Sequence, residues 1–133
     1  MAPKSSRAAP AEKPTVASVA VLVSDPTRSV EWYTEKLGLE VLDRMDHWIT
    51  VGRKGEGGKL HLCRPSDYDP KQPLEPGNSG ILLTLPGKDF SAACARLKAR
   101  GVEFSTEPTT ESWGTYAVVR DPDGNEHTLM PAG

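Results

Sequence analysis

Two stretches of the chain show the same succession of hydrophobic and polar positions. In the first, apolar residues alternate over 16–23, and after a turn they recur every three or four positions until Gly38. The first pattern predicts a strand and the second a helix, because strand side chains alternate between two faces and a helix face repeats about every 3.6 residues. Three more strand candidates follow, at 39–44, 47–53 and 59–64. This stretch therefore predicts the order βαβββ.

The same succession returns in the second half of the chain. A proline-rich segment over 65–79 separates the halves and predicts a long connecting loop without an element of its own. After it, 81–85 predict a strand, and 88–100 predict a helix that ends at Gly101. The remaining strand candidates are 102–106, 116–120 and 126–130. The second half therefore predicts βαβββ as well.

The two halves also align residue by residue. SVAVLV at 18–23 lies against GILLTL at 80–85, and LHLC at 60–63 lies against HTLM at 127–130. Such a repeat marks a duplicated unit, and a unit of about sixty residues is too small to bury both faces of its own sheet. We therefore expect the two units to pack together around a shared core.

The predicted fold class is α+β, with two βαβββ modules forming a curved mixed sheet around a cleft. Module 1 spans residues 15–65 and module 2 spans residues 79–131, within a single domain over 15–133. Residues 1–14 combine proline, alanine, serine and scattered charge without an apolar period. Such a segment buries too little surface to offset the entropy of ordering, so we expect a disordered tail.

Composition and charge exclude several classes of protein. The 133 residues carry a net charge of −2, with 37% hydrophobic and 26% charged positions, as in an ordinary soluble globular domain. There is no basic excess for holding nucleic acid, and no apolar run approaches the roughly 18 residues that a membrane span needs. The N-terminus lacks the apolar centre of a secretory signal, so we expect a cytoplasmic protein whose cysteines, Cys63 and Cys94, are thiols.

Two fragments of the chain resemble a known family. VSDPTRSVEWYTEKLGLEVLDR, near the start, and ESWGTYAVVRDPDGNEHTLM, near the end, are similar to the glyoxalase, bleomycin-resistance and extradiol-dioxygenase superfamily, also called vicinal oxygen chelate proteins. The resemblance implies paired βαβββ modules around an open cleft, often in a homodimer. This fold hosts lyases, dioxygenases, metal-dependent transferases and proteins that only sequester a drug, so it implies no single activity.

The resemblance also implies where a catalytic metal would bind. Metal-dependent relatives take ligands from four strand positions, which fall here on Ser18, His61, Gly80 and Thr128. A catalytic divalent ion needs about three ligands drawn from imidazole, carboxylate or thiolate, and only His61 is one of these. Cys63 shares a strand face with His61, but two such ligands do not complete a site. We therefore expect no metal cofactor.

The face of the predicted sheets that lines the cleft supplies the candidate ligand-binding residues. Alternation along the strands places small and mixed side chains on this face and uniformly apolar ones on the face that the helices cover. Aromatic residues on or beside the strands offer flat surfaces to a planar ligand, or pack in the core or a dimer interface. The candidate residues are Ser18, Trp48, His61, Cys63, Trp113, Tyr116, Thr128 and Met130.

Three function classes are compatible with these residues. The first is a small-molecule-binding protein without a metal, which sequesters a drug or a metabolite and forms a homodimer, with neither nucleic acid nor membrane as a partner. The second is a divalent-metal lyase or dioxygenase that uses His61 with partners such as Glu126 or His47. The third is a scaffold whose cleft is vestigial. The sequence identifies no catalytic residue and favours the first class.

Overall fold

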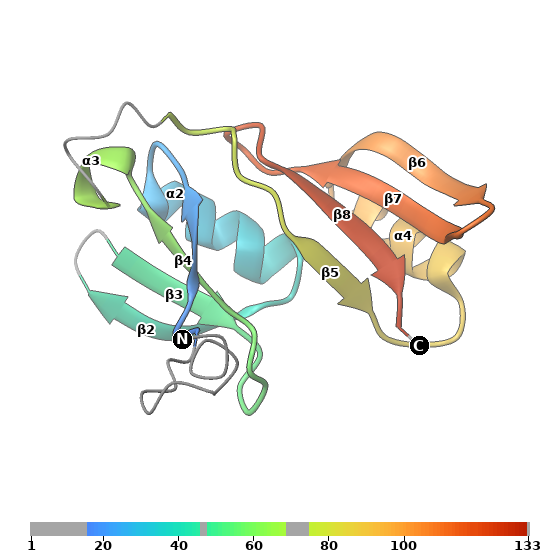
Figure 1. The fold of residues 1–133 in the computed structure, drawn as a ribbon, viewed down its shortest axis with the longest axis horizontal. Helices are drawn as coiled ribbons and strands as arrows, with labels where there is room; N and C mark the ends of the chain where they lie inside the picture. Colours follow the sequence, from blue (N-terminus) through green and yellow to red (C-terminus); the bar gives the residue numbers. More distant parts are fainter. Residues whose placement is uncertain (1–15, 46–47, 69–74, 133) are drawn as a thin grey trace, which may run out of the picture.

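The computed structural model of the chain describes residues 16–45, 48–68 and 75–132, and it contains both predicted modules (Figure 1). In module 1 the strands form one sheet in the order β1-β4-β3-β2, in which β1 and β4 are parallel and the other neighbours are antiparallel. The elements are β1 (Val19–Leu22), α2 (Pro26–Glu31), η1 (Trp32–Lys36), β2 (Glu40–Met45), β3 (Trp48–Gly52) and β4 (Lys59–Cys63).

Module 2 repeats this topology in a second four-stranded sheet, ordered β5-β8-β7-β6. Its elements are β5 (Leu82–Leu85), α4 (Phe90–Ala99), β6 (Glu103–Glu111), β7 (Gly114–Arg120) and β8 (Glu126–Pro131). The strand registers agree with the alignment of the halves, because Ala20 lies opposite His61 in module 1 and Leu82 lies opposite Thr128 in module 2. The predicted α+β fold of two βαβββ modules is confirmed.

Local details differ from the predictions. The segment 65–79 was expected to hold no element, but a single helical turn, α3 (Pro65–Tyr68), begins in it. Proline fits the first turn of a helix, and one turn is too short to produce a hydrophobic period. The first helix changes after Glu31 into the π-helical turn η1, in which Leu37 N–H donates to the carbonyl of Trp32. The tail predicted over 1–14 lies outside the described residues.

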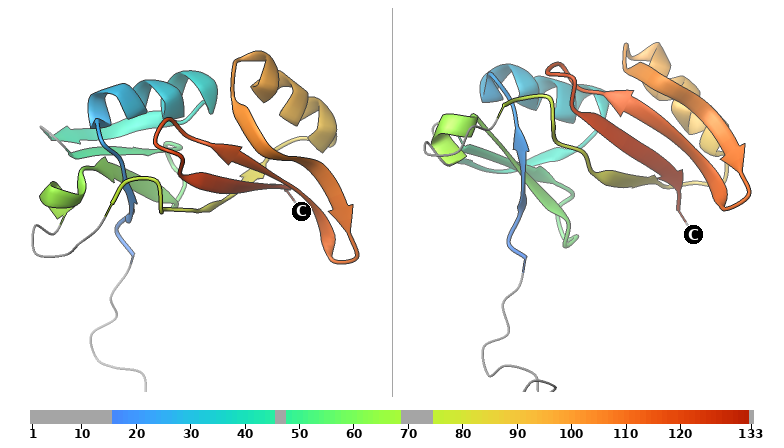
Figure 2. Two further views of the ribbon diagram at one scale, coloured as in Figure 1. Left: turned by 90° about the horizontal axis from the view of Figure 1, so that it is seen from above. Right: turned by 45° about the horizontal axis from the view of Figure 1, so that its top comes forward.

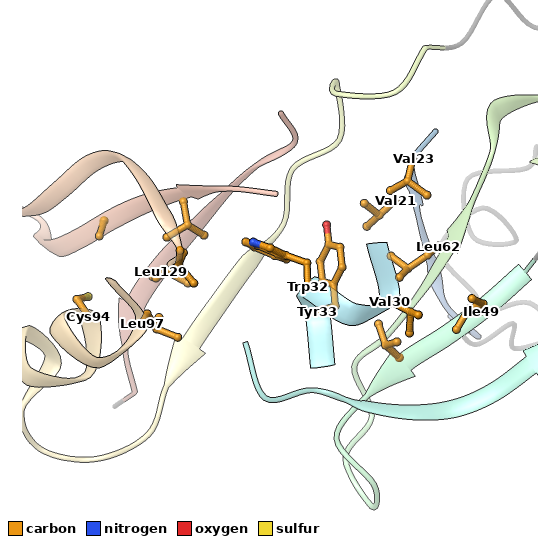
Figure 3. Close-up of a cluster of buried hydrophobic side chains, with 14 residues drawn as sticks. Val21, Val23, Val30, Trp32, Tyr33, Ile49, Leu62, Cys94, Leu97 and Leu129 are labelled. Carbon is orange, nitrogen blue, oxygen red and sulfur yellow. The ribbon is translucent and has the colours of Figure 1, made fainter. Parts of the chain in front are cut away.

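The helices of both modules cover one side of the two sheets, which leaves the other side open (Figure 2). The buried core lies under the helices, and Figure 3 shows Trp32 between the core residues of the two modules. Val21 and Val23 are fully buried there, as the alternation predicts, but Val19 is 48% exposed because it borders a cavity between the modules. No helix in the described ranges is long and apolar enough to cross a membrane.

A buried polar joint connects the modules. The Tyr33 hydroxyl, on η1, donates to Asp121 Oδ2 at 2.6 Å and lies 2.7 Å from His127 Nε2. Asn125 Nδ2 donates to the same Asp121 oxygen and also to the carbonyl of Leu22 on β1. Burial and the charge of Asp121 raise the pKa of Tyr33, so its hydroxyl keeps its proton. The two modules therefore share polar groups as well as a hydrophobic core.

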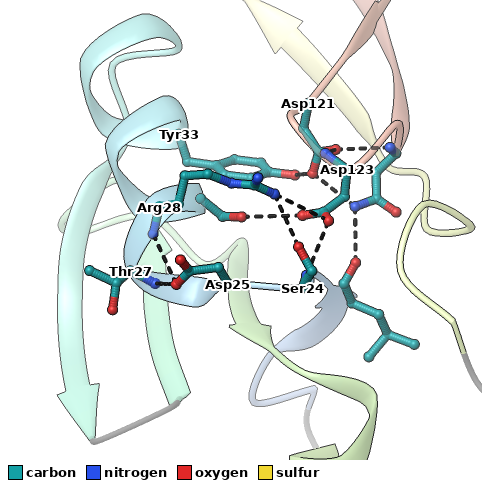
Figure 4. Close-up of polar contacts among 10 residues, drawn as sticks. Ser24, Asp25, Thr27, Arg28, Tyr33, Asp121 and Asp123 are labelled. Carbon is teal, nitrogen blue, oxygen red and sulfur yellow. Dashed lines mark hydrogen bonds and ion pairs between the residues drawn. The ribbon is translucent and has the colours of Figure 1, made fainter.

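The turn between β7 and β8 also contacts the start of α2 (Figure 4). Asp123 Oδ1 accepts hydrogen bonds from the backbone N–H of Ser24 and from the Arg28 guanidinium. Asp25 caps the helix, because its carboxylate accepts from the N–H groups of Thr27 and Arg28. Module 2 thus fixes the strand-to-helix corner of module 1, which sets the position of β1.

Candidate functional site

Each sheet has an open face, defined here as the face turned away from the helices. The predicted site residues are divided between these two faces, because each belongs to the strands of one module. The registers place Ser18, Ala20, Met45, Trp48, Thr50 and His61 on the open face of module 1. They place Leu82, Thr84, Tyr116, Val118, Thr128 and Met130 on the open face of module 2.

Ser18, His61 and Trp48 form a contiguous group on module 1, which we call the His61 cluster. Ser18 Oγ lies 2.6 Å from His61 Nδ1, and the rings of His61 and Trp48 stack with centroids 4.1 Å apart and planes 12° apart. His61 is only 5% exposed, and burial lowers its pKa, so the imidazole is neutral at pH 7. The cluster places the Trp48 indole beside the Ser18 hydroxyl, with the buried imidazole of His61 in contact with both.

Cys63 does not reach the surface as the sequence suggested. It shares the strand face of His61, but its side chain is fully buried. Burial, assisted by the charge of Asp67, raises the pKa of Cys63 to about 11. A thiol with this pKa is a poor nucleophile and a poor metal ligand at neutral pH. Cys63 therefore belongs to the packing of the sheet.

The remaining predicted residues lie on module 2. Trp113, in the turn between β6 and β7, is 63% exposed and stacks on Tyr116 with ring centroids 5.1 Å apart. Met130 Cε lies 3.9 Å from the position that a Cβ would take on Gly114, so it is next to the start of β7. Thr128 is partly buried between Val118 and Leu82. This open face combines apolar and aromatic side chains with the hydroxyls of Thr84 and Thr128.

A cavity of about 450 Å³ lies between the first strands of the two modules. Its volume is within the range of small-molecule sites, roughly 300–1,000 Å³. Of the predicted site residues Ser18 alone lines it, and Ser18 connects it to His61 and Trp48. The lining is apolar except for Ser18, Lys59 and glycine backbone. Its residues are Val16, Ser18, Val19, Leu39, Gly52, Gly57, Gly58, Lys59, Leu60, Ile81, Leu82 and Leu83.

The residues at the metal positions do not fit a divalent ion. Ser18 and His61 are in contact, but Thr128 supplies only a neutral hydroxyl and Gly80 supplies no side chain. A Cβ on Gly80 would lie 2.8 Å from the carbonyl oxygen of Glu126, so the backbone leaves no space for a ligand there. Within the described residues, no group of three or more His, Cys, Asp or Glu side chains could hold a metal.

Sequence reasoning missed both the cavity and the polar joint. The glycine-rich segment 55–58 only joins two predicted strands in the sequence, whereas in the structure Gly57 and Gly58 line the cavity. In the turn at 121–125, Asp121 Oδ1 accepts from two N–H groups of the turn itself, which is a local arrangement typical of its sequence. Asp121 Oδ2 also accepts from Tyr33, 88 residues away. Pairings at such separations leave no local pattern.

Comparisons with known proteins agree with this architecture. The model of the Glyoxalase/Bleomycin resistance protein/Dioxygenase superfamily matches residues 15–129. YurT of Bacillus subtilis (strain 168), an uncharacterized protein, is 33% identical over 113 residues, which cover 79% of this chain and 89% of YurT. A probable lactoylglutathione lyase of Vibrio cholerae is 28% identical over 115 residues, covering 77% of this chain and 79% of the lyase.

The solved structures include a similar protein of stated function. TnmS3 from Streptomyces sp. CB03234, described as an antibiotic binding protein, is 32% identical in sequence with a TM-score of 0.72. The match covers 91% of this chain and 98% of TnmS3. The resemblance therefore extends over both modules.

Proposed function

Because the chain belongs to the Glyoxalase/Bleomycin resistance protein/Dioxygenase superfamily, we propose that it binds a small organic molecule, an antibiotic or a metabolite, without a catalytic metal. The observation that carries the proposal is the apolar cavity of about 450 Å³ that Ser18 connects to the His61 cluster. The similarity to TnmS3 over most of both chains supports it. Only one of the four metal-ligand positions carries an imidazole, which supports ligand binding rather than metal chemistry.

The chemistry of the site selects the class of ligand. The cavity takes an apolar body, because most of its lining is aliphatic. A planar part of the ligand stacks on the Trp48 ring, and the Ser18 hydroxyl supplies a hydrogen bond that fixes its orientation. We expect a largely apolar, partly aromatic molecule rather than a small charged metabolite.

A homodimer is part of the proposal. Val16, Met45, Leu82 and Trp113 are exposed by 78%, 63%, 61% and 63%. Met45 and Leu82 lie on the open faces, Val16 lies two positions before Ser18, and Trp113 stacks on Tyr116. Exposed apolar groups on or beside the open face of each module give both faces the character of a contact surface. A second copy placing its module 2 over module 1 would cover them and bring Trp113 and Tyr116 to the ligand. Sedimentation equilibrium should give a dimer, and a monomer at high micromolar concentration would contradict this part.

A charge placed in the cavity tests ligand binding. Leu82→Glu puts a carboxylate into the apolar lining at an exposed position, so the protein should still fold. Tryptophan fluorescence titrations with bleomycin and a panel of planar aromatic antibiotics should give at least one ligand, bound more than tenfold more weakly by Leu82→Glu. Val41→Glu is the matched control, because Val41 is 42% exposed and does not line the cavity. Equal affinities in the two variants would refute the cavity as the site.

A second function is favoured by one comparison and by one residue. The similarity to a probable lactoylglutathione lyase and the imidazole of His61 support a divalent-metal enzyme. Calorimetry with zinc, nickel, manganese and iron(II) distinguishes the two functions. We expect flat titrations, and His61→Ala should leave them unchanged. Stoichiometric binding at low micromolar affinity that His61→Ala abolishes would favour the enzyme.

A further inference from the structure

Three arginines from both modules line a second cavity, of about 240 Å³, which we call the Arg cleft. Arg53 follows β3 of module 1, and Arg96 and Arg100 lie one turn apart at the end of α4 in module 2. Residues four apart on a helix project from the same face, so both reach one cleft. The other lining residues are apolar or glycine, and no acidic residue among those that the structure describes lines the cleft.

The positive charge of the Arg cleft is not neutralised by the described part of the chain. Arg28, Arg64 and Arg120 each form an ion pair with a carboxylate. The guanidinium groups in the Arg cleft form none with any described residue, and only Arg100 makes a hydrogen bond there, from Nη1 to the carbonyl of Lys36 at 3.0 Å.

The carboxyl ends of two helices offset part of the positive charge of the Arg cleft. Leu37 is the C-cap residue of η1 and Arg100 is the C-cap residue of α4, and both line the Arg cleft. A helix carboxyl end carries about half a negative charge, so two ends offset roughly one of the three guanidinium charges. A surplus of about two positive charges remains without a partner. This surplus exceeds what capping the two helices requires, and it matches a dianion.

We propose that the Arg cleft binds the dianionic phosphate group of a small phosphate monoester. Guanidinium groups donate pairs of hydrogen bonds to phosphate oxygens, and here they approach from both modules. The Arg cleft shares no lining residue with the cavity of the proposed function, so the inference does not depend on that function. A bound phosphate would connect Arg53 of module 1 to Arg96 and Arg100 of module 2.

Calorimetry with phenyl phosphate at constant ionic strength tests the proposal. The wild-type chain should bind one equivalent, and Arg53→Gln and Arg96→Gln should each weaken binding at least tenfold. Arg100 is left intact because it also holds the Lys36 carbonyl. Arg44→Gln is the matched control, since it removes the same charge from an exposed position outside the Arg cleft and should change affinity less than twofold. Circular dichroism of each variant verifies folding.

A pH series separates phosphate recognition from general attraction of anions. A phosphate monoester loses its second proton near pH 6, whereas sulfate stays a dianion. Affinity for phenyl phosphate should rise about fourfold from pH 5.5 to 7.5, while affinity for sulfate stays flat. If Arg53→Gln, Arg96→Gln and the control Arg44→Gln all weakened phenyl phosphate binding equally, the binding would depend on net charge alone and the Arg cleft would not be the site. Failure of phenyl phosphate to bind would overturn the proposal, and neither result affects the small-molecule cavity.

Discussion

Each module has one buried histidine on its last strand, but the two histidines face opposite sides of their sheets. His61, on β4, lies on the open face beside Ser18 and Trp48. His127, on β8, lies on the helix side, where its ring contacts Tyr33. The residue equivalent to His61 in module 2 is Thr128, one position further along. Because strand side chains alternate, a shift of one residue separates a candidate ligand-binding histidine from a structural one.

The surroundings of His127 fix its protonation. Its Nδ1 accepts a hydrogen bond from the backbone N–H of Ile81 at 3.3 Å, so the proton of the neutral ring is on Nε2. That proton faces the Tyr33 hydroxyl, which donates in turn to Asp121. Burial lowers the pKa of His127, although the charge of Asp121 opposes the shift. The neutral ring of His127 thus joins the modules, whereas the buried ring of His61 packs against Trp48 and Ser18 within module 1.

Removing the Tyr33 hydroxyl from the polar joint should give the largest loss of stability. Tyr33→Phe leaves Asp121 and His127 buried without one partner each, and we expect it to lower the free energy of unfolding by about 2–3 kcal/mol in urea denaturation. Tyr116→Phe is the control, because its hydroxyl makes no hydrogen bond to another described residue. It should cost less than about 0.5 kcal/mol. Equal losses in the two variants would show that the joint contributes nothing.

A side chain introduced at Gly80, one of the metal positions of module 2, should destabilise the fold. Gly80→Ser places a Cβ 2.8 Å from the Glu126 carbonyl oxygen, which belongs to the backbone and must move. Overpacking of this kind should lower the free energy of unfolding by about 1–3 kcal/mol. Gly58→Ser is the control, because a Cβ there meets nothing within 4 Å and the change should be near neutral. Urea denaturation measures both variants. A stable Gly80→Ser variant would mean that the module 2 position can accept a side chain.

Both histidines should make the fold sensitive to mild acid. Burial lowers the pKa of each in the folded chain, so below about pH 6.5 the unfolded chain takes up protons that the folded chain does not. Stability should therefore be constant above pH 6.5 and fall with decreasing pH, by up to about 1.4 kcal/mol per pH unit for each histidine. Urea denaturation between pH 5 and 7.5 measures this dependence of stability on pH. His61→Gln should remove the part of the slope that His61 contributes. A flat profile would contradict the lowered pKa values.

The fold was predictable from sequence because its signals are local. Alternation, helical spacing and turn residues such as those at 121–125 act within a few positions, and the internal repeat doubled each signal. The turn α3 and the π-helical turn η1 were not predictable, since neither is long enough to show a period. Alternation also placed Ser18 and His61 on one face of the predicted sheet, and the structure places them in contact.

The site was only partly predictable because its walls come from distant segments. The volume between the modules depends on how β1 and β5 lie relative to each other, and the contacts around Asn125 and Tyr33 that set this relation span about a hundred residues. Burial of Cys63 has the same origin, since alternation gives the face of a residue but not what covers it. The sequence therefore identified the faces, and the packing of the modules determined which residues on them are accessible.

The smallest effect on stability should come from the residue that is most useful for testing association. Trp113 is 63% exposed and touches Tyr116, so Trp113→Ala should lower the free energy of unfolding by less than about 0.5 kcal/mol. If a second copy covers the open faces, the same change should weaken dimerisation at least tenfold in sedimentation experiments, because exposed aromatic groups dominate such contacts. Lys88→Ala, an exposed residue outside both open faces, should leave dimerisation unchanged. A dimer that tolerates Trp113→Ala would place the interface elsewhere and leave the two open faces unpaired with each other.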